Sequence, residues 1–215
     1  AAAKSVIIQG IREGERRVMQ EAYENKHEEI ITATVSKVDH ETGNVVLETD
    51  NGRAVLLRSE QIPGETFYVG DKIKVFVMEV NKESRGPVVT LSRSHAGLVR
   101  RMFELEIPEI ADGLINVHRI ARIPGERAKI AVESYDERID PVGACVGVKG
   151  ARIHGIVREL NNENIDVINY TPNISLYIQR ALSPAKISSI RLDEENKQAS
   201  VWLKPEEVSL AIGKN

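Results

Sequence analysis

The sequence predicts an α+β protein of several domains: a leader helix, a small five-stranded β-barrel, and a helix-and-strand module that begins to repeat. Three observations lead to this prediction. β-branched runs separated by turn signals begin near residue 27, helix and strand patterns alternate from residue 95, and the alternation recurs after roughly 70 residues. The 215 residues, 41% hydrophobic and 28% charged, suffice to build several buried cores.

Residues 1–26 predict the leader helix. Four apolar residues recur at helical spacing among many charges: Ile7, Ile11, Val18 and Ala22. The helix either covers the following module or connects this region to a preceding domain, and the sequence favours neither. The first four residues hold no initiator Met and no apolar signal core, so we expect the native N-terminus to lie upstream.

Residues 27–94 predict a barrel of the OB fold. Its five strands are short and β-branched: Ile30–Val38, Val45–Thr49, Ala54–Leu57, Ile73–Val80 and Val88–Leu91. Five such strands in one small domain are typical of the OB fold. Asp50-Asn51-Gly52 indicates a hairpin, because Asn-Gly tolerates the positive φ that tight turns require. Phe76, in an apolar strand, is expected in the core.

Residues 95–172 predict a module with the order helix, strand, strand, helix, Gly-rich loop, helix, strand. The expected helices are Ala96–Glu106, a short one opened by Pro141, and Ala151–Leu160; the expected strands are Leu114–Ile123, Ala128–Ser134 and Ile165–Tyr170. Residues 173–215 repeat this order as far as a short helix, Pro205–Ile212. We expect the second module to be incomplete and its strand residue Trp202 to lie in a core.

The Gly-rich loop of the first module is Gly147-Val148-Lys149-Gly150. A bare Gly-x-x-Gly is weak support, since about one match arises by chance in a chain of this length. Between two helices it gains meaning. Without β-carbons, the loop lets backbone N–H groups approach the phosphates of about four single-stranded nucleotides, as in the K-homology (KH) module. The alternative is a tight helix–helix turn with no ligand.

The residues expected to bind RNA belong to this loop and its surroundings. They are Gly147, Val148, Lys149, Gly150, Ala151, Arg152, Ile153, His154 and Arg158, and in the second, forming loop Gly213, Lys214 and Asn215. Lys149, Arg152 and Arg158 would supply positive charge, and the helix N-terminus behind the loop favours anions. We expect the bases in an apolar groove lined by Val146, Ile153 and the strand around Ile130 and Val132.

The run from Lys129 to Ile153, continued by Val157–Val167, resembles the first KH module of the NusA family of bacterial transcription factors. Ser209–Lys214 resembles the start of that family's second loop. The preceding barrel, down to its closing Leu91-Ser92-Arg93, resembles the RNA-binding module named after ribosomal protein S-one. The resemblance covers nearly the whole chain, and its order, a barrel followed by tandem KH modules of type II, is more specific than any single motif.

This resemblance implies a non-enzymatic protein that binds single-stranded RNA, the nascent transcript. It implies action with RNA polymerase core in elongation, pausing, termination and antitermination, and contact with other antitermination factors through the full-length protein. The single cysteine, which cannot form an intramolecular disulfide, separately indicates a reducing cytoplasm. A rival interpretation is an RNA-binding accessory subunit of a ribonuclease or exosome-type complex. A third is an adaptor that binds only proteins, which would not require Lys149 and Arg152 at the loop.

The barrel departs from the pattern of its relatives. Many such barrels stack bases on exposed aromatic residues of their second and third strands, whereas these strands here carry aliphatic residues such as Val46 and Val55. Phe67 and Tyr68 lie in a loop. We therefore expect a supporting, mainly electrostatic role through four arginines: Arg53, Arg58, Arg85 and Arg93.

Other classes of function find no support in the sequence. The five histidines show no metal-ligand spacing, the single Cys145 is best read as a packing residue, and no nucleophile–base set is visible. No Walker loop and no cofactor motif is present, and no apolar run is long enough for a membrane span. The net charge of −3 argues against whole-domain basicity, but Arg85 to Arg101 carry four arginines and no acid, which permits a basic face.

Overall fold

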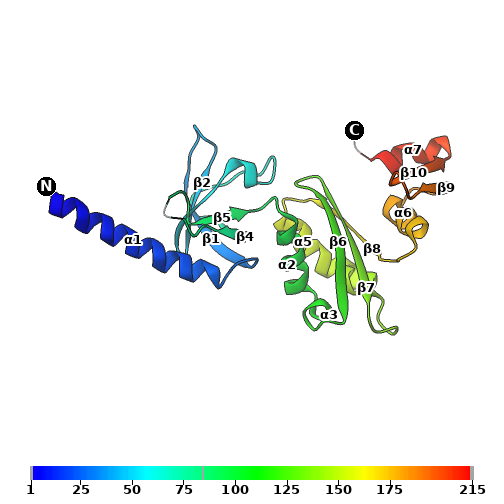
Figure 1. The fold of residues 1–215 in the computed structure, drawn as a ribbon. Coiled ribbons are helices and arrows are strands. Elements are labelled where there is room, and N and C mark those ends of the chain that lie inside the picture. Colours follow the sequence, from blue (N-terminus) through cyan, green and yellow to red (C-terminus); the bar gives the residue numbers. More distant parts are fainter. Residues whose placement is uncertain (1, 84, 214–215) are drawn as a thin grey trace.

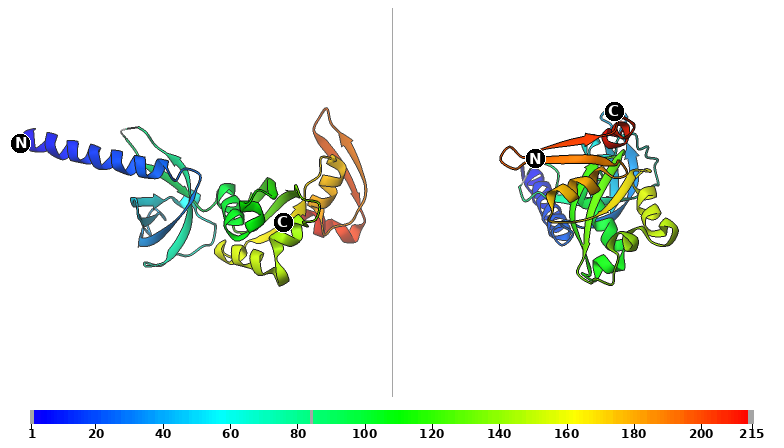
Figure 2. Two further views of the ribbon diagram at one scale, coloured as in Figure 1. Left: turned by 90° about the horizontal axis from the view of Figure 1, so that it is seen from below. Right: turned by 90° about the vertical axis from the view of Figure 1, so that its right-hand side faces the viewer.

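The computed structural model describes residues 2–83 and 85–213. They form three units in a row, with the leader helix projecting from the first (Figures 1 and 2). The elements are α1 (Ala2–Glu24), β1 (Ile30–Val38), β2 (Val45–Thr49), β3 (Gly52–Leu56), the 3-10 turn Arg58–Glu60, β4 (Lys72–Val80), β5 (Val89–Ser92), α2 (Ala96–Glu106), α3 (Pro108–Ala111), β6 (Ile115–Ile123), β7 (Arg127–Ser134), α4 (Pro141–Val146), the 3-10 turn Val148–Gly150, α5 (Ala151–Glu159), β8 (Asn164–Asn169), α6 (Ile174–Leu182), β9 (Ile187–Asp193), β10 (Gln198–Leu203) and α7 (Pro205–Ile212). The predicted order is confirmed, with α3 and two 3-10 turns added.

The first unit is a nearly closed antiparallel barrel. Its strands pair in the order β3-β2-β1-β4-β5, and β3 and β5 approach each other at the open side. Side chains alternate between the two faces of the strands, so Val45 and Leu47 of β2 and Leu56 of β3 are buried inside. The five β-branched runs from which the sequence predicted the barrel correspond to these strands.

The leader helix α1 covers the barrel with its C-terminal half. Tyr23 is completely buried in the barrel core, with its hydroxyl 2.7 Å from Thr49 Oγ1. Arg16 donates hydrogen bonds to the carbonyl oxygens of Glu83 at 2.7 and 3.0 Å and of Gly86 at 2.7 Å. The N-terminal half extends away from the barrel (Figure 2) and leaves apolar residues such as Ile7 exposed.

The second unit has the predicted KH topology. Its sheet has the order β6-β7-β8, with β6 and β7 antiparallel and β7 and β8 parallel. Helices α2, α4 and α5 pack on the sheet, and their apolar residues form one core with Ile130 and Val132 of the central strand β7. Cys145 of α4 lies in this core, as predicted, with no solvent exposure.

The third unit is a smaller assembly of the hairpin β9–β10 with α6 and α7. Of the described residues 174–213, Ala185 is the only one that is buried. The prediction that Trp202 lies in a core is wrong, because its side chain is 51% exposed. Trp202 pairs with Ser189, which places it on the face opposite to Leu192 and Ala199, and these two residues line a cavity together with α6.

Candidate nucleic-acid interface

The loop between α4 and α5 projects from the second unit. Gly147, Lys149 and Gly150 all have positive φ, of 76°, 54° and 77°. This backbone turns Val148 into solvent, where it is 83% exposed, and Lys149 is exposed beside it. An exposed valine next to an exposed lysine on a tight turn has no packing role, so the surface is open to a ligand.

Both loop glycines are required by their surroundings. A β-carbon on Gly147 would lie 2.9 Å from Arg152 Cγ, and one on Gly150 would lie 2.8 Å from His154 Cε1. Left-handed backbone adds strain for any other residue at these positions. The side chains of α5 therefore pack directly against bare backbone, which brings the N-terminus of α5 close to the loop surface.

The structure distributes the other predicted loop residues between surface and interior. Ala151, His154 and Arg158 are exposed on α5. Ile153 is only 8% exposed and belongs to the core. Arg152 is half-buried, and its Nη1 donates to Glu109 Oε2 and to the carbonyl oxygen of Ala144, both at 2.8 Å. The guanidinium of Arg152 thus joins α3 and α5 and secures the last turn of α4.

The second predicted loop is described only in part. Gly213 has a φ of 77° and follows α7 directly. Lys214 and Asn215 lie outside the described residues. The expected contact of this loop with RNA stays a prediction.

The expected apolar groove needs a correction. Ile130 and Val132 have no solvent exposure, because β7 is the central strand of the sheet. The edge strand next to α4 is β8, where Val167 is half-buried. A base beside the loop would therefore meet β8, not β7. The sequence alone did not reveal which strand was central, because both are equally apolar.

The barrel arginines also differ from one another. Arg53, Arg58 and Arg85 are exposed, and Arg53 pairs with Glu48 at 3.2 Å. Arg93 is 1% exposed, which corrects its prediction as an RNA contact. Its guanidinium donates to Glu65 Oε1 at 2.5 Å, to the carbonyl oxygen of Lys74 at 2.6 Å and to that of Glu159 at 2.8 Å. Arg93 thus joins the barrel to α5 of the first KH module.

Two basic residues that the sequence reading missed lie beside the second loop. Arg127 and Lys129 of β7 line a cavity of about 330 Å³ together with Ser183, Ser209 and Gly213 of the third unit. Lys129 Nζ lies 3.2 Å from Asp166 Oδ2 and donates to the carbonyl oxygen of Ser183 at 3.1 Å. Arg127 and Lys129 are two positions apart on one strand, so both side chains lie on the same face. This spacing could have indicated a basic site from the sequence.

The described residues contain no group of three or more His, Cys, Asp or Glu side chains placed to hold a metal ion. Within residues 2–83 and 85–213, no helix has the length and apolar character of a membrane span. Burial, reinforced by the Glu109 carboxylate, raises the pKa of Cys145 to about 12, which favours the protonated thiol at neutral pH.

Comparison with protein families agrees with this architecture. Residues 93–170 match a model described as the NusA-like first KH domain, and residues 174–215 match one described as the NusA-like second KH domain. The matched segments coincide with the second and third units of the structure. The resemblance seen in the loop residues therefore extends over the first KH module and over the part of the second that this chain contains.

Several curated proteins are similar over nearly the whole chain, and each is named transcription termination/antitermination protein NusA. The protein of Thermus thermophilus is 41% identical over 210 residues, covering 98% of this chain and 54% of the relative. That of Halalkalibacterium halodurans is 40% identical over 99% of this chain and 55% of its own length. That of Bacillus subtilis is 39% identical over 99% of this chain and 57% of its own length. The chain spans about half the length of these relatives. With the leader helix, the barrel and the tandem KH modules in one order, the chain belongs to the NusA family.

Proposed function

We propose that this chain binds single-stranded RNA as the central region of a NusA-type transcription factor. Its partners would be the nascent transcript, RNA polymerase core and other antitermination factors, and its role would lie in elongation, pausing, termination and antitermination. The names of the relatives and the two KH modules support this proposal. We further propose that it acts in the cytoplasm and without catalysis of its own.

One observation carries the proposal. In the loop Gly147–Gly150, an exposed valine and an exposed lysine lie between two glycines that have no β-carbon to shield the backbone. An RNA phosphate can reach the backbone N–H groups there, and the ammonium group of Lys149 lies on the same turn. The Arg152–Glu109 pair joins α3 to the first turn of α5, directly after the loop.

We propose that the domains of the chain have different roles in RNA binding. In this proposal the domains are the leader segment 1–26, the barrel 27–94, the first KH module 95–172 and the second KH module 173–215. The loop residues Gly147–Lys149, together with Ala151, His154 and Arg158 on α5, would contact the first RNA segment. Arg53, Arg58 and Arg85 of the barrel would attract the RNA electrostatically, because they are exposed.

Replacing Val148 and Lys149 by Asp tests the proposal. Two carboxylates on the loop would repel phosphates, and neither native side chain is buried, so the fold should persist. We expect affinity for a single-stranded RNA to fall by at least about tenfold in a binding titration. The matched control is Val6→Asp with Lys4→Asp, which makes the same charge change on the exposed half of α1. Equal affinity of the loop variant and the control, with unchanged circular dichroism, would overturn the proposal.

A further inference from the structure

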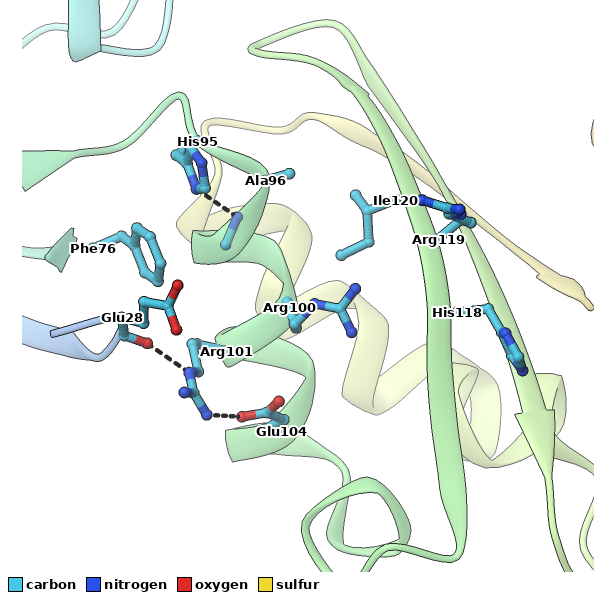
Figure 3. Close-up of a pocket in the computed structure, with 11 residues that line it drawn as sticks. Glu28, Phe76, His95, Ala96, Arg100, Arg101, Glu104, His118, Arg119 and Ile120 are labelled. Atoms are coloured by element: carbon cyan, nitrogen blue, oxygen red, sulfur yellow. Dashed lines mark hydrogen bonds and ion pairs between the residues drawn. The ribbon is translucent and has the colours of Figure 1, made fainter. Parts of the chain in front are cut away.

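A cleft of about 430 Å³ lies where the barrel meets the first KH module (Figure 3). Glu28 and Phe76 line it from the barrel side, and Arg100 and Arg101 line it from α2. Ile120 of β6 forms the opposite wall. In the sheet order β6-β7-β8 this cleft lies at the β6 edge, whereas the Gly147–Gly150 loop follows α4, which packs over β8. The cleft is therefore a separate place on the module.

An aromatic platform stands at the rim of the cleft. The His95 ring is stacked on Phe76, with ring centroids 5.1 Å apart and planes 5° from parallel. Phe76 is 4% exposed and covers one face of the imidazole, whereas His95 as a residue is exposed to solvent. His95 also caps α2, because its Nδ1 accepts a hydrogen bond from the Gly97 N–H at 3.0 Å. The ring is thus held in one orientation before any ligand arrives.

Gly97 makes this stack possible. A β-carbon there would lie 2.7 Å from Phe76 Cε1 and 2.8 Å from His95 Nδ1. The space left by the missing side chain admits the edge of the phenyl ring against the first turn of α2. The platform is therefore built by three residues from two modules.

Guanidinium groups lie next to the platform. Arg100 points from α2 toward β6 (Figure 3). Its Nη1 donates to the carbonyl oxygen of Val117 at 2.7 Å. Arg101 Nε donates to the carbonyl oxygen of Glu28 at 2.6 Å, and its Nη1 to Glu104 Oε2 at 2.6 Å. A guanidinium has five N–H donors, so each keeps donors beyond these bonds. Glu28 and Glu104 offset part of the positive charge.

We infer that this cleft is a second nucleotide site for single-stranded RNA, in which a base stacks on His95 and an adjacent phosphate is bound by Arg100. An open aromatic face beside oriented guanidinium donors is the chemistry that recognises a nucleotide. The inference rests on the proposed RNA-binding function and adds the contact that the barrel strands, which lack exposed aromatic residues, do not supply. Since loop and cleft lie at opposite edges of one sheet, only an RNA longer than the loop's own segment can occupy both.

The rival occupant is an extended polypeptide that adds a strand to the edge strand β6. The Arg100 bond disfavours it. The carbonyl oxygen of Val117 faces away from β7, and it is the acceptor that an added strand would use. With that acceptor occupied by a side chain, the edge is covered at this point.

Two substitutions of His95 distinguish its role in stacking on a base from its role in capping α2. His95→Asn keeps an acceptor for the Gly97 N–H but removes the ring, whereas His95→Tyr keeps a ring but removes the cap acceptor. With an RNA of about 16 nucleotides, we expect His95→Asn to lose about tenfold in affinity, the loss of one stacked base. We expect His95→Tyr to bind within about twofold of the native chain, although it melts at a lower temperature because the cap is lost. Arg100→Gln should lower the affinity for the same long RNA.

A tetranucleotide that fills only the loop should bind all of these variants equally. The matched control is His40→Asn with Arg12→Gln, two exposed positions on the barrel and on α1. A long RNA carrying 5-iodouridine should cross-link to His95, and a tetranucleotide should not.

Three results would each be decisive. If native protein binds neither RNA, the proposed function itself fails. If it binds both and His95→Asn leaves the long RNA unaffected, the cleft is no nucleotide site and the strand edge of β6 becomes the place to test with an acidic peptide. If affinity follows melting temperature across the two His95 variants, the residue serves only as a helix cap.

Discussion

Arg122 and Glu163 form an ion pair that solvent does not reach. Their side chains are 2% and 0% exposed, and Arg122 Nε lies 2.8 Å from Glu163 Oε1. Arg122 also donates through Nη1 to the carbonyl oxygens of Arg93 at 2.9 Å and His95 at 3.0 Å, while Glu163 accepts the Gly125 N–H at 3.1 Å. This ion pair thereby connects three segments: the turn between β6 and β7, the residue that precedes β8, and the segment that links the barrel to α2.

Removing one partner of this pair should be costly, because the other charge stays buried. We expect Glu163→Ala to lower the free energy of unfolding by about 3–5 kcal/mol in urea titrations. The exposed pair Arg53–Glu48 supplies the control, and Glu48→Ala should cost less than about 1 kcal/mol. The double variant Arg122→Met with Glu163→Leu should lose less than Glu163→Ala alone. Similar losses for Glu163→Ala and Glu48→Ala would show that burial does not govern these pairs.

Lys149 and Arg152 should differ in what their loss affects. Lys149 is exposed on the loop, so Lys149→Ala should reduce the slope of log affinity against log salt by about one, with stability unchanged. Arg152 pairs with Glu109, so Arg152→Ala should chiefly lower stability. Measuring RNA affinity over a salt series, alongside thermal melting, separates the two effects. A salt slope that falls for Arg152→Ala with no change in melting would instead assign Arg152 to the phosphate.

Much of the fold could be predicted because its signals are local. β-branched runs separated by turn residues predicted β1 to β5, and the proline and glycine positions around Pro141–Gly150 predicted the helix–loop–helix. Arg93 could not be placed, since its partners Glu65 and Glu159 are 28 and 66 residues distant in sequence. Trp202 was misplaced because an apolar residue on a two-stranded ribbon has no second layer on its outer face. The His95–Phe76 platform joins two modules, so neither module's pattern contains it.

Cys145 should resist thiol reagents in the folded chain. Its pKa of about 12 leaves almost no thiolate at neutral pH, and the side chain has no solvent exposure. Labelling near pH 8 should therefore proceed only through unfolding. Because folding raises this pKa, the folded state holds the proton more tightly, and its contribution to stability falls as pH rises from about 9 toward 12. A Ser5→Cys, Cys145→Ala chain, whose thiol lies on exposed α1, is the matched control and should label at once. Equal labelling rates would contradict the buried placement.

Hydrogen exchange should separate the two KH modules. Strands β6 and β7 enclose a core of completely buried side chains, whereas in the third unit Ala185 is the only buried residue among 174–213. We expect amides of β9 and β10 to exchange at least about a hundredfold faster than those at the centre of β7. Mass spectrometry of peptides covering 187–203 and 127–134 measures this. Equal protection would mean that the hairpin is stabilised by contacts other than burial.

The boundary between barrel and first KH module has a consequence for how the protein can be dissected. In sequence the two modules separate at residues 94 and 95, but Arg93 binds carboxylates on both sides and Arg122 reaches back to the carbonyl oxygens of Arg93 and His95. A cut at that point would separate Arg93 from Glu159 and Arg122 from the carbonyl oxygen of Arg93. Arg93 would keep Glu65 but lose its second carboxylate partner, whereas the Arg122–Glu163 pair would stay within one fragment. The boundary that the sequence suggests therefore crosses bonds that stabilise both modules, and we expect the barrel and the first KH module to be more stable as one fragment than as two.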